Sequence, residues 1–253
     1  MGNLFDIQGK KAFVTGSGTG IGRGIAEGFL EAGATVVLSS RTQAAEEAAS
    51  EYRSRGHKAF AVTGDLGDSS RVEGIFTEAL KILGGNIDIL VNNAGTQHRA
   101  ASEDFPLAEF DRVMNVNLRC YFQLSQLAGR IMLARGYGKI INIGSMQSFF
   151  GIPRTPAYAA SKGAVAQLTK VLGNEWISRG VNVNAIAPGW FDTKLIKAVM
   201  EDEVRSAEIM GRLPAGKWGQ ARDIKGPAIF LASAASDYLA GVILPVDGGY
   251  LAR

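Results

Sequence analysis

The sequence predicts an α/β protein in which helices cover both faces of a doubly wound parallel sheet. Short apolar runs rich in Val and Ile recur along the chain, which is typical of strands buried on both faces. Longer segments with helical spacing separate them, as in Ile21, Ile25 and Phe29. This alternation indicates βαβ units, and the 253 residues suit a single domain, 1–253.

Seven apolar runs are expected to form the strands, at residues 12–15, 35–38, 59–62, 87–91, 140–143, 181–186 and 242–246. The connection before the last strand is the longest. Residues 191–218 contain one or two helical segments and a Pro/Gly turn. Such an insertion would lie beyond the carboxyl ends of the strands, where ligands bind in these sheets, so we expect a substrate lid.

Composition and charge argue against several classes of protein. The net charge of +3 is too small and dispersed to indicate a nucleic-acid surface. The one cysteine, Cys120, excludes an intrachain disulfide and favours a reducing compartment, so we expect a cytoplasmic protein. Residues 1–11 lack the apolar run of a signal peptide, and no stretch reaches the length of a membrane helix. The two histidines stand in no ligand cluster, so no metal is expected.

A glycine-rich loop, residues 15–22, follows the first predicted strand and leads directly into a helix. Glycine lets the backbone approach a diphosphate closely, and a helix N-terminus supplies free N–H groups. The spacing is Gly-x-x-x-Gly-x-Gly rather than Gly-x-Gly-x-x-Gly, and it predicts a dinucleotide site, with a purely structural turn as the alternative. The loop residues expected to bind the cofactor are Gly16, Ser17, Thr19, Gly20, Ile21 and Gly22.

Further motifs follow the predicted strands in order. They are Asp65-Leu66, Asn92-Asn-Ala-Gly95, Asn115-Val-Asn117, Ser145, Tyr158-x-x-x-Lys162 and Pro188-Gly189. Together with the loop, this series resembles the short-chain dehydrogenase/reductase family over essentially the whole chain. The resemblance implies a Rossmann-type sheet of seven parallel strands and an assembly of tetramers or dimers, with a homotetramer favoured.

The resemblance also implies residue roles. Tyr158 would be the acid/base and Lys162 would hold the nicotinamide ribose. Ser145 would polarise the substrate carbonyl, and Asn117 would support a water relay, unless it is merely a residue of a helix kink. The other cofactor-binding residues implied are Asp65, Leu66, Asn92, Ala94, Gly95, Pro188, Gly189 and Thr193.

Tyr158 and Lys162 also make chemical sense without the resemblance. Thr155 and Pro156 suit an N-cap and a first helical residue, which places the pair at positions i and i+4 on one helix face. A phenol titrates near pH 10, and a nearby ammonium and an oxidised nicotinamide would lower that pKa. The phenol could then exchange a proton with a substrate alcohol or carbonyl.

The end of the second strand bears on cofactor choice. An acidic residue there would bind the ribose hydroxyls of NAD, but Ser40 takes this place and Arg41 follows. A guanidinium suits a 2′-phosphate, so NADP is favoured over NAD. NAD stays open, because no basic residue lies between Gly16 and Gly20 and because Arg41 could instead stack on adenine or face solvent.

The loops near the reaction centre are polar and contain Gln147 and two arginines, Arg99 and Arg154. Two arginines favour an anionic, hydroxyl-rich small molecule, unless each pairs with an acidic side chain. The segments 206–209, 212–219 and 246–253 resemble the sugar-acid branch of the family, whose members act on carbon 5 of gluconate or of its 2-dehydro-3-deoxy derivative. Lys217 departs from the Arg common in that branch.

Three functions therefore remain. The leading one is an NAD(P)-dependent oxidoreductase that moves a hydride between nicotinamide and a secondary alcohol or ketone of a sugar acid. A 3-oxoacyl-carrier-protein reductase would require Arg99, Arg154 and Lys217 to form a basic patch at the pocket mouth. A cofactor-sensing regulator without turnover would typically lack Tyr158 or Lys162, and both are present.

Overall fold

The computed structural model describes residues 3–194 and 196–253, and its centre is one seven-stranded parallel sheet. The strand order is β3-β2-β1-β4-β5-β6-β7. The strands are β1 (Lys11–Val14), β2 (Thr35–Ser40), β3 (Ala59–Thr63), β4 (Ile89–Asn92), β5 (Gly138–Ile143), β6 (Val181–Pro188) and β7 (Ile243–Val246). All seven predicted strands are confirmed, with ends that shift by one or two residues.

The direction of the winding reverses at β1. Val14 pairs with Leu38 of β2 on one side and with Val91 of β4 on the other. The connections leaving β1 and β4 therefore run to opposite sides of the sheet, which opens a crevice at the carboxyl ends of these strands. The candidate site lies at this crevice.

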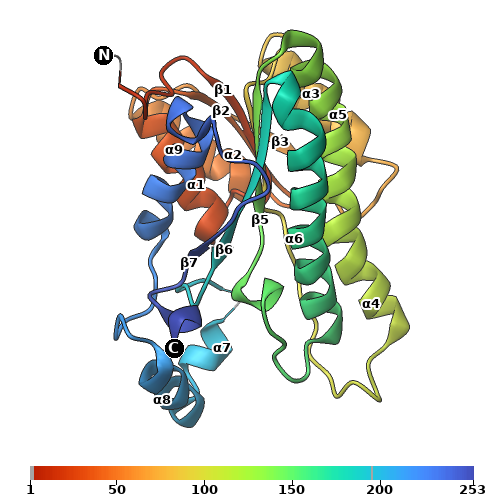
Figure 1. Ribbon diagram of the computed structural model, residues 1–253, viewed down its shortest axis with the longest axis vertical. Helices are drawn as coiled ribbons and strands as arrows, with labels where there is room; N and C mark the ends of the chain where they lie inside the picture. The colour runs from red at the N-terminus through yellow and green to blue at the C-terminus, as the bar shows by residue number, and fades with distance from the viewer. Residues whose placement is uncertain (1–2, 195) are drawn as a thin grey trace.

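Two layers of helix cover the sheet (Figure 1). One layer contains α1 (Gly20–Glu31), α2 (Ala44–Ser54) and α9 (Lys225–Ala232), and the other contains α3 (Val72–Ile82), α5 (Cys120–Arg135) and α6 (Pro156–Trp176). Neighbouring residues of β1 face different layers, since Val14 packs with Ile25 of α1 and Phe13 packs with Phe76 of α3. Strands buried on both faces explain the continuous apolar runs.

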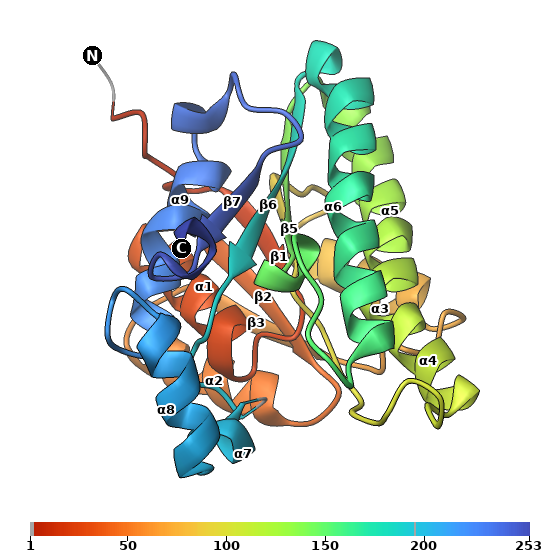
Figure 2. The same ribbon diagram turned by 60° about the horizontal axis from the view of Figure 1, so that its bottom comes forward.

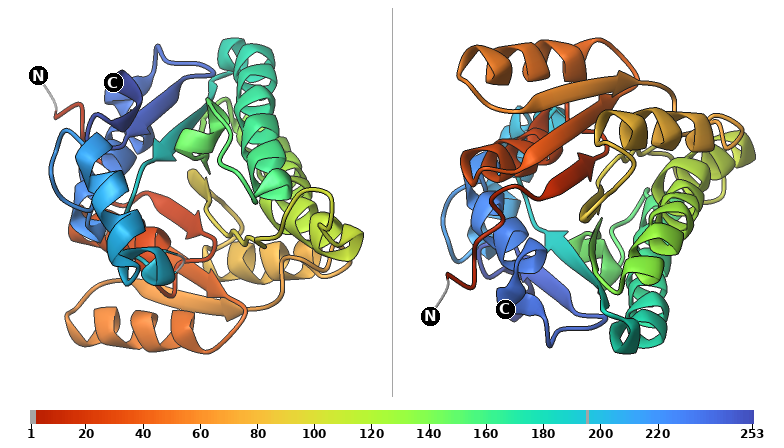
Figure 3. Two further views of the ribbon diagram at one scale, coloured as in Figure 1. Left: turned by 90° about the horizontal axis from the view of Figure 1, so that it is seen from below. Right: turned by 90° about the horizontal axis from the view of Figure 1, so that it is seen from above.

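The connection between β6 and β7 carries the expected helical segments. They are α7 (Lys197–Met200) and α8 (Glu203–Arg212), while Leu195 of the predicted lid lies outside the described residues. Both helices extend beyond the carboxyl ends of the strands (Figure 2), and the view from below places α8 on that side (Figure 3). A small apolar cluster that includes Trp190, Ile209 and Tyr250 holds this segment together.

One helix contains an irregular turn. Between α4 (Leu107–Met114) and α5, residues Asn115–Arg119 form a π-helical turn, which has one residue more than an α-helical turn. Short 3-10 helices cover Met146–Ser148, Ile177–Arg179, Ala221–Ile224, Ala234–Ser236 and Tyr250–Ala252. In the described part of the chain, no helix is both long enough and apolar enough to cross a membrane.

Candidate active site

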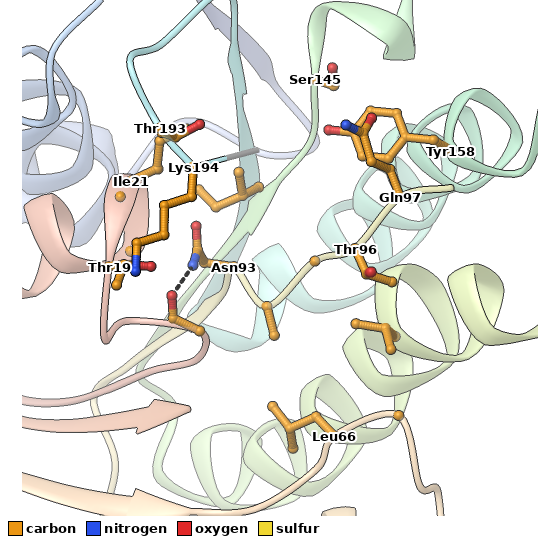
Figure 4. Close-up of a pocket in the computed structure, with 18 of the residues that line it drawn as sticks. Thr19, Ile21, Leu66, Asn93, Thr96, Gln97, Ser145, Tyr158, Thr193 and Lys194 are labelled. Carbon is orange, nitrogen blue, oxygen red and sulfur yellow. Dashed lines mark hydrogen bonds between the residues drawn. The ribbon is translucent and has the colours of Figure 1, made fainter. Parts of the chain in front are cut away.

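A cavity of about 930 Å³ opens at the carboxyl ends of the strands. Its wall combines the glycine loop, the segments that follow β2 to β6, and the beginning of the β6–β7 connection, as Figure 4 shows in part. Its wall includes Arg41, which follows β2, as well as Arg99 after β4 and Tyr158 of α6, so it spans several neighbouring strands. This volume suits a dinucleotide with a small substrate beside it.

The glycine loop lies against the end of β4. Gly16 has φ +61°, and a Cβ there would stand 2.7 Å from the Cα of Ala94, so no other residue fits without a backbone shift. Asn93 Nδ2 donates to the carbonyl oxygens of Thr15 (2.8 Å) and Gly16 (2.9 Å). Figure 4 marks one hydrogen bond from the side-chain amide of Asn93.

The N-terminus of α1 fits the diphosphate of a nicotinamide dinucleotide. Thr19 is the N-cap residue, but no side chain caps the helix and its first turn holds no acidic residue. The first N–H groups are thus left for a ligand, and the positive end of the helix favours an anion. Across the cavity, Thr193 packs close to Gly20, since its Cγ2 would lie 3.3 Å from a Cβ at Gly20.

The predicted adenosine end is polar and open. Arg41 lies exposed on the cavity wall. Ser40 is engaged in its own turn, because its hydroxyl donates to the Thr42 carbonyl (2.5 Å) and accepts from Ala45 N (3.0 Å). Asp65 also lines the wall and accepts from Gly67 N (2.8 Å), which shapes the turn after β3.

Ser145 and Tyr158 reach the other end of the cavity from different elements. Ser145 follows β5, and its hydroxyl accepts from Gln147 N (3.1 Å). Tyr158 lies in the first turn of α6, and Figure 4 shows its hydroxyl directed into the cavity on the same side as Ser145. Burial raises the pKa of Tyr158, while a hydrogen bond with Ser145 acts in the opposite direction.

Lys162 is 3% exposed and lies one helical turn after Tyr158. Its Nζ donates to the Ile143 carbonyl (2.7 Å) and lies 5.7 Å from the centre of the Tyr158 ring and 5.2 Å from that of Tyr121. Burial without a carboxylate lowers the pKa of Lys162 to about 7. The expected i, i+4 pairing on one face is confirmed.

The expected N-cap at Thr155 and first helical residue at Pro156 are confirmed. The Thr155 hydroxyl makes its hydrogen bonds with Gln147 Oε1 and Ile152 O and not with the first turn of the helix. The ammonium of Lys162, together with an oxidised nicotinamide, is expected to lower the pKa of Tyr158. In the protein without ligand, burial of the phenol is the largest effect and raises that pKa instead.

Most of the predicted site residues line this cavity. They are Gly16, Thr19, Gly20, Ile21, Gly22, Arg41, Asp65, Leu66, Ala94, Gly95, Arg99, Ser145, Gln147, Tyr158, Lys162, Pro188, Gly189 and Thr193. The sequence motifs thus converge on one place. Four predicted residues do not belong to this wall: Ser17, Asn92, Asn117 and Arg154.

Ser17 and Asn92 are buried beneath the cavity. The Ser17 hydroxyl donates to Val14 O (2.7 Å) and accepts from Ser39 N (3.0 Å), so it ties the ends of two strands together. Asn92 Nδ2 donates to Ser125 Oγ (3.0 Å) and Asn142 Oδ1 (2.9 Å) inside the sheet. The neighbouring Asn93 stands at the wall instead.

Asn117 lies in the π-helical turn, and both ends of its amide are engaged. Its Oδ1 accepts from Thr96 N (2.8 Å), while Nδ2 donates to Thr96 O (2.9 Å) and Ser161 Oγ (3.1 Å). Asn117 thereby fixes the loop after β4 beside α6. The helix irregularity named as the alternative is present, and the role of Asn117 in a water relay stays a prediction.

The substrate end carries an unpaired group of arginines. Burial lowers the pKa of Arg99, and the positive charges of Arg205 and Arg154 lower it further. Arg154 is exposed, has φ +68°, and accepts from Ala100 N (3.2 Å) through its carbonyl. Within residues 3–194 and 196–253, none of these three guanidiniums has an ion pair, so the expected alternative of acidic partners is wrong there. Lys217 lies apart, at a smaller cavity of about 150 Å³.

Some residues at the site were missed by the sequence analysis. Arg112 of α4 donates to Thr96 Oγ1 (2.8 Å) and to Glu109 Oε2, and so braces the loop that carries Arg99. Arg205 and Lys194 come from the β6–β7 connection. No motif marks Arg112, Arg205 or Lys194. The only sequence feature that covers Arg205 and Lys194 is the predicted lid, residues 191–218.

Comparison with known proteins defines the family. A family model described as enoyl-(acyl carrier protein) reductase matches residues 16–251. The chain belongs to the short-chain dehydrogenase/reductase family, and it is an oxidoreductase of that family.

Individual relatives cover nearly the whole chain. The 2-dehydro-3-deoxy-D-gluconate 5-dehydrogenase of Bacillus subtilis (strain 168) is 51% identical and covers 99% of this chain and 98% of its own. A structure from Beutenbergia cavernae, named as a candidate NAD(P)-dependent gluconate 5-dehydrogenase with bound NADP, is 45% identical with a TM-score of 0.96 and covers 99% and 100%. A gluconate 5-dehydrogenase from Burkholderia cenocepacia, in complex with NADP and tartrate, is 43% identical with a TM-score of 0.93 and covers 99% and 98%.

Proposed function

We propose that this protein is an NADP-dependent dehydrogenase of sugar acids, which oxidises a secondary alcohol of a gluconate-type or 2-dehydro-3-deoxy-gluconate-type substrate and can reduce the matching ketone. The names of its relatives support this class of substrate. The observation that carries the proposal is Arg99, which lines the same cavity as Ser145 and Tyr158 and has two further cations, Arg154 and Arg205, near enough to act on its charge.

The charge of this group explains the preference for an acid. Arg99 is partly buried and is disfavoured by the positive charges of Arg205 and Arg154, so an anion bound beside it would stabilise its guanidinium. A hexose-derived acid has its carboxylate several bonds from carbon 5. Arg99 on the wall is therefore suited to hold the carboxylate while the reacting carbon lies near Tyr158 and Ser145.

The proposed residues divide the chemistry between them. When bound, NADP accepts the hydride that leaves the carbinol carbon. Tyr158 takes the proton of the same hydroxyl, so the alcohol loses a hydride and a proton and becomes a ketone. Ser145 donates a hydrogen bond to the reacting oxygen, and Lys162 is placed to hold ribose hydroxyls. The phenolate of Tyr158 would be favoured by the positive charge of a bound oxidised nicotinamide.

The substrate proposal is tested by comparing acidic and neutral sugars. We expect the wild-type enzyme to turn over hexonates faster than the corresponding neutral polyols. Loss of a buried charge-assisted hydrogen bond costs about 1.5–3 kcal/mol, so Arg99→Met should lower kcat/KM for acids by roughly tenfold to a hundredfold. Arg154→Met should have a smaller effect, because Arg154 is exposed.

Steady-state assays of nicotinamide absorbance give the outcome. The neutral polyol is the internal control, since it has no carboxylate to lose. Equal losses for acidic and neutral substrates would assign the arginines to fold support. A wild-type enzyme with no preference for acids would remove the sugar-acid proposal.

The choice of NADP over NAD rests on Arg41. It lies exposed on the cavity wall without an ion pair among the described residues, next to a serine where an acidic residue would exclude a 2′-phosphate. We expect wild type to bind NADP more tightly than NAD and Arg41→Asp to reverse this order. Fluorescence titration measures the dissociation constants of both cofactors for wild type and variant. A wild-type preference for NAD would refute the assignment.

A second candidate is a 3-oxoacyl-carrier-protein reductase, which would use Arg99 and Arg154 in a basic patch. Lys217, the third expected member of that patch, lies at the smaller cavity instead. Acetoacetyl thioesters distinguish the two functions, because such a reductase should prefer them to sugar acids. A regulator that binds the cofactor without catalysing a reaction has no need for Tyr158 and Lys162 to lie together at the cavity. Turnover of any substrate would exclude this third function.

Exposed apolar side chains on the outer helices favour a homotetramer, and these are Leu107, Phe122 and Val171. Light scattering during size-exclusion chromatography would test this assembly.

Residues 191–218 are proposed to act as the substrate lid. The buried thiol of Cys120 suits a reducing cytoplasm.

A further inference from the structure

Lys194 is a charged residue at the cavity wall that neither the sequence motifs nor the proposed chemistry uses. It lies next to Thr193 at the start of the β6–β7 connection. Figure 4 shows its side chain extending from this connection toward Thr19 in the glycine loop. In the described residues, it has no ion pair or side-chain hydrogen bond.

The surroundings of Lys194 narrow what it can bind. The other cations of the described wall are Arg41, Arg99, Arg112 and Lys162. Arg41 and Arg99 lie toward opposite ends of the cavity, Arg112 pairs with Glu109, and Lys162 donates to the Ile143 carbonyl. Lys194 is therefore the cation directed at the glycine loop.

The glycine loop presents N–H groups and the positive end of α1, but no charged side chain of its own. A diphosphate at this place carries about two negative charges, and the helix end contributes only roughly half a positive charge. A Cβ added at Gly20 would lie only 3.3 Å from Thr193 Cγ2, so the residue that follows Thr193 starts close to the same loop.

We propose that Lys194 binds the diphosphate of the dinucleotide, and that this contact couples cofactor binding to the position of the lid. The inference rests on the proposed cofactor site. It adds a residue contributed by the lid segment, whose charge contacts the part of the cofactor that NADP and NAD share. Cofactor affinity and the order of the segment after Lys194 then depend on each other.

Cofactor fragments test the proposal without turnover. ADP-ribose carries the diphosphate and no 2′-phosphate, whereas 2′-AMP carries a phosphate and no diphosphate. We expect Lys194→Met to weaken binding of ADP-ribose, NAD and NADP by about three- to tenfold at low salt, with a smaller loss at high salt. Binding of 2′-AMP should not change, and Lys194→Arg should restore most of the affinity.

Lys197→Met is the matched control, because Lys197 lies three residues further along, is 74% exposed and pairs with Glu201 at 3.8 Å. Calorimetric titration measures the dissociation constants, and protease cleavage within 196–218 reports the lid. ADP-ribose should protect the lid in wild type and in Lys197→Met more than in Lys194→Met.

The possible failures can be separated. If wild type binds neither ADP-ribose nor NADP, the proposed cofactor site is wrong. If wild type binds both and Lys194→Met binds them equally well, the role of Lys194 is refuted and the cofactor site stands. A loss confined to NADP and 2′-AMP would refute the diphosphate assignment, and unchanged protection would refute the coupling to the lid.

Discussion

Two buried lysines lie at opposite ends of the same region of the sheet, and they differ in what surrounds them. Lys139 is near the start of β5 and is 1% exposed. Lys162 belongs to α6, but its Nζ donates to Ile143, the last residue of β5. One ammonium is thus near the amino end of the strands and the other is at the carboxyl end.

Their partners differ in kind. Lys139 Nζ donates to Asp237 Oδ1 (2.6 Å), Asn182 Oδ1 (2.9 Å) and Ser236 Oγ (3.4 Å). Burial lowers the pKa of Lys139, but its hydrogen bond with Asp237 acts against that shift. Lys162 has one carbonyl and two aromatic rings, and its pKa falls to about 7.

The comparison shows that the partners of a buried lysine indicate whether it serves the fold or a binding site. A buried lysine with a full set of partners stabilises the native packing. A buried lysine without a counter-charge costs free energy in the empty protein, and such groups are typical of sites where a ligand completes the environment. The same distinction holds for the unpaired Arg99.

The largest effect is expected beside Lys162. Tyr158→Phe keeps the ring but removes the transferable proton, so turnover should fall by about 10²–10⁴-fold. NADP binding should persist, because the glycine loop and Lys162 are unchanged. Steady-state kinetics and cofactor titration on the same preparation measure both quantities. Near-normal turnover would show that Tyr158 is not the acid/base.

A smaller effect, on stability instead of turnover, is expected at Lys139. Lys139→Met leaves the buried Asn182 Oδ1 without its donor, which should cost about 1–3 kcal/mol in the free energy of unfolding. Asp237 adds little because its side chain is 65% exposed. Urea unfolding measures the loss, and Lys197→Met should stay within about 0.5 kcal/mol of wild type.

The comparison predicts that kcat/KM stays near the wild-type value in folded Lys139→Met. A variant of normal stability with impaired turnover would contradict the assignment of Lys139 to structure.

The last expected effect is a pH dependence caused by Lys162. Its folded-state pKa is about 7, whereas an unfolded lysine titrates near 10.4. Between these values the unfolded chain binds the additional proton, so the free energy of unfolding rises with pH. The penalty for burying the ammonium is full below pH 7 and disappears above about 10.4.

Lys162→Met should abolish this rise, which is at most about 1.4 kcal/mol per pH unit. Urea unfolding of the protein without cofactor at pH 7, 8 and 9 measures the slope for both proteins. Equal slopes in the two proteins would show that Lys162 keeps an ordinary pKa.

The sequence was most informative where local chemistry and backbone geometry coincide. The seven strands follow from continuous apolar runs, and Gly16 follows from a turn that leaves no room for a Cβ. Tyr158 and Lys162 follow from helical spacing. Each of these is fixed by residues close together in the chain.

Features that depend on long-range packing were not predictable in the same way. Asn92 and Asn93 are adjacent and chemically identical, yet one bonds inside the sheet and the other stands at the cavity. Strand pleating decides which side chain faces inward, and the exact end of β4 sets that choice. The charge of Arg205, in α8, acts on Arg99, and neither the spacing of Arg205 nor its neighbours in the chain indicate this interaction.

The π-helical turn at Asn115–Arg119 bears on how this family of chains can vary in length. Each residue of a regular α-helix turns the chain by about 100°, so deleting one residue inside α4 or α5 would rotate the parts on either side by roughly that angle. The π-helical turn already holds one residue more than an α-helical turn, so a deletion there would give a regular helix and leave Ala108, Asp111 and Arg112 at the cavity wall. Loss of a single residue should therefore be tolerated in evolution far more readily in this turn than in the regular turns of α4 and α5.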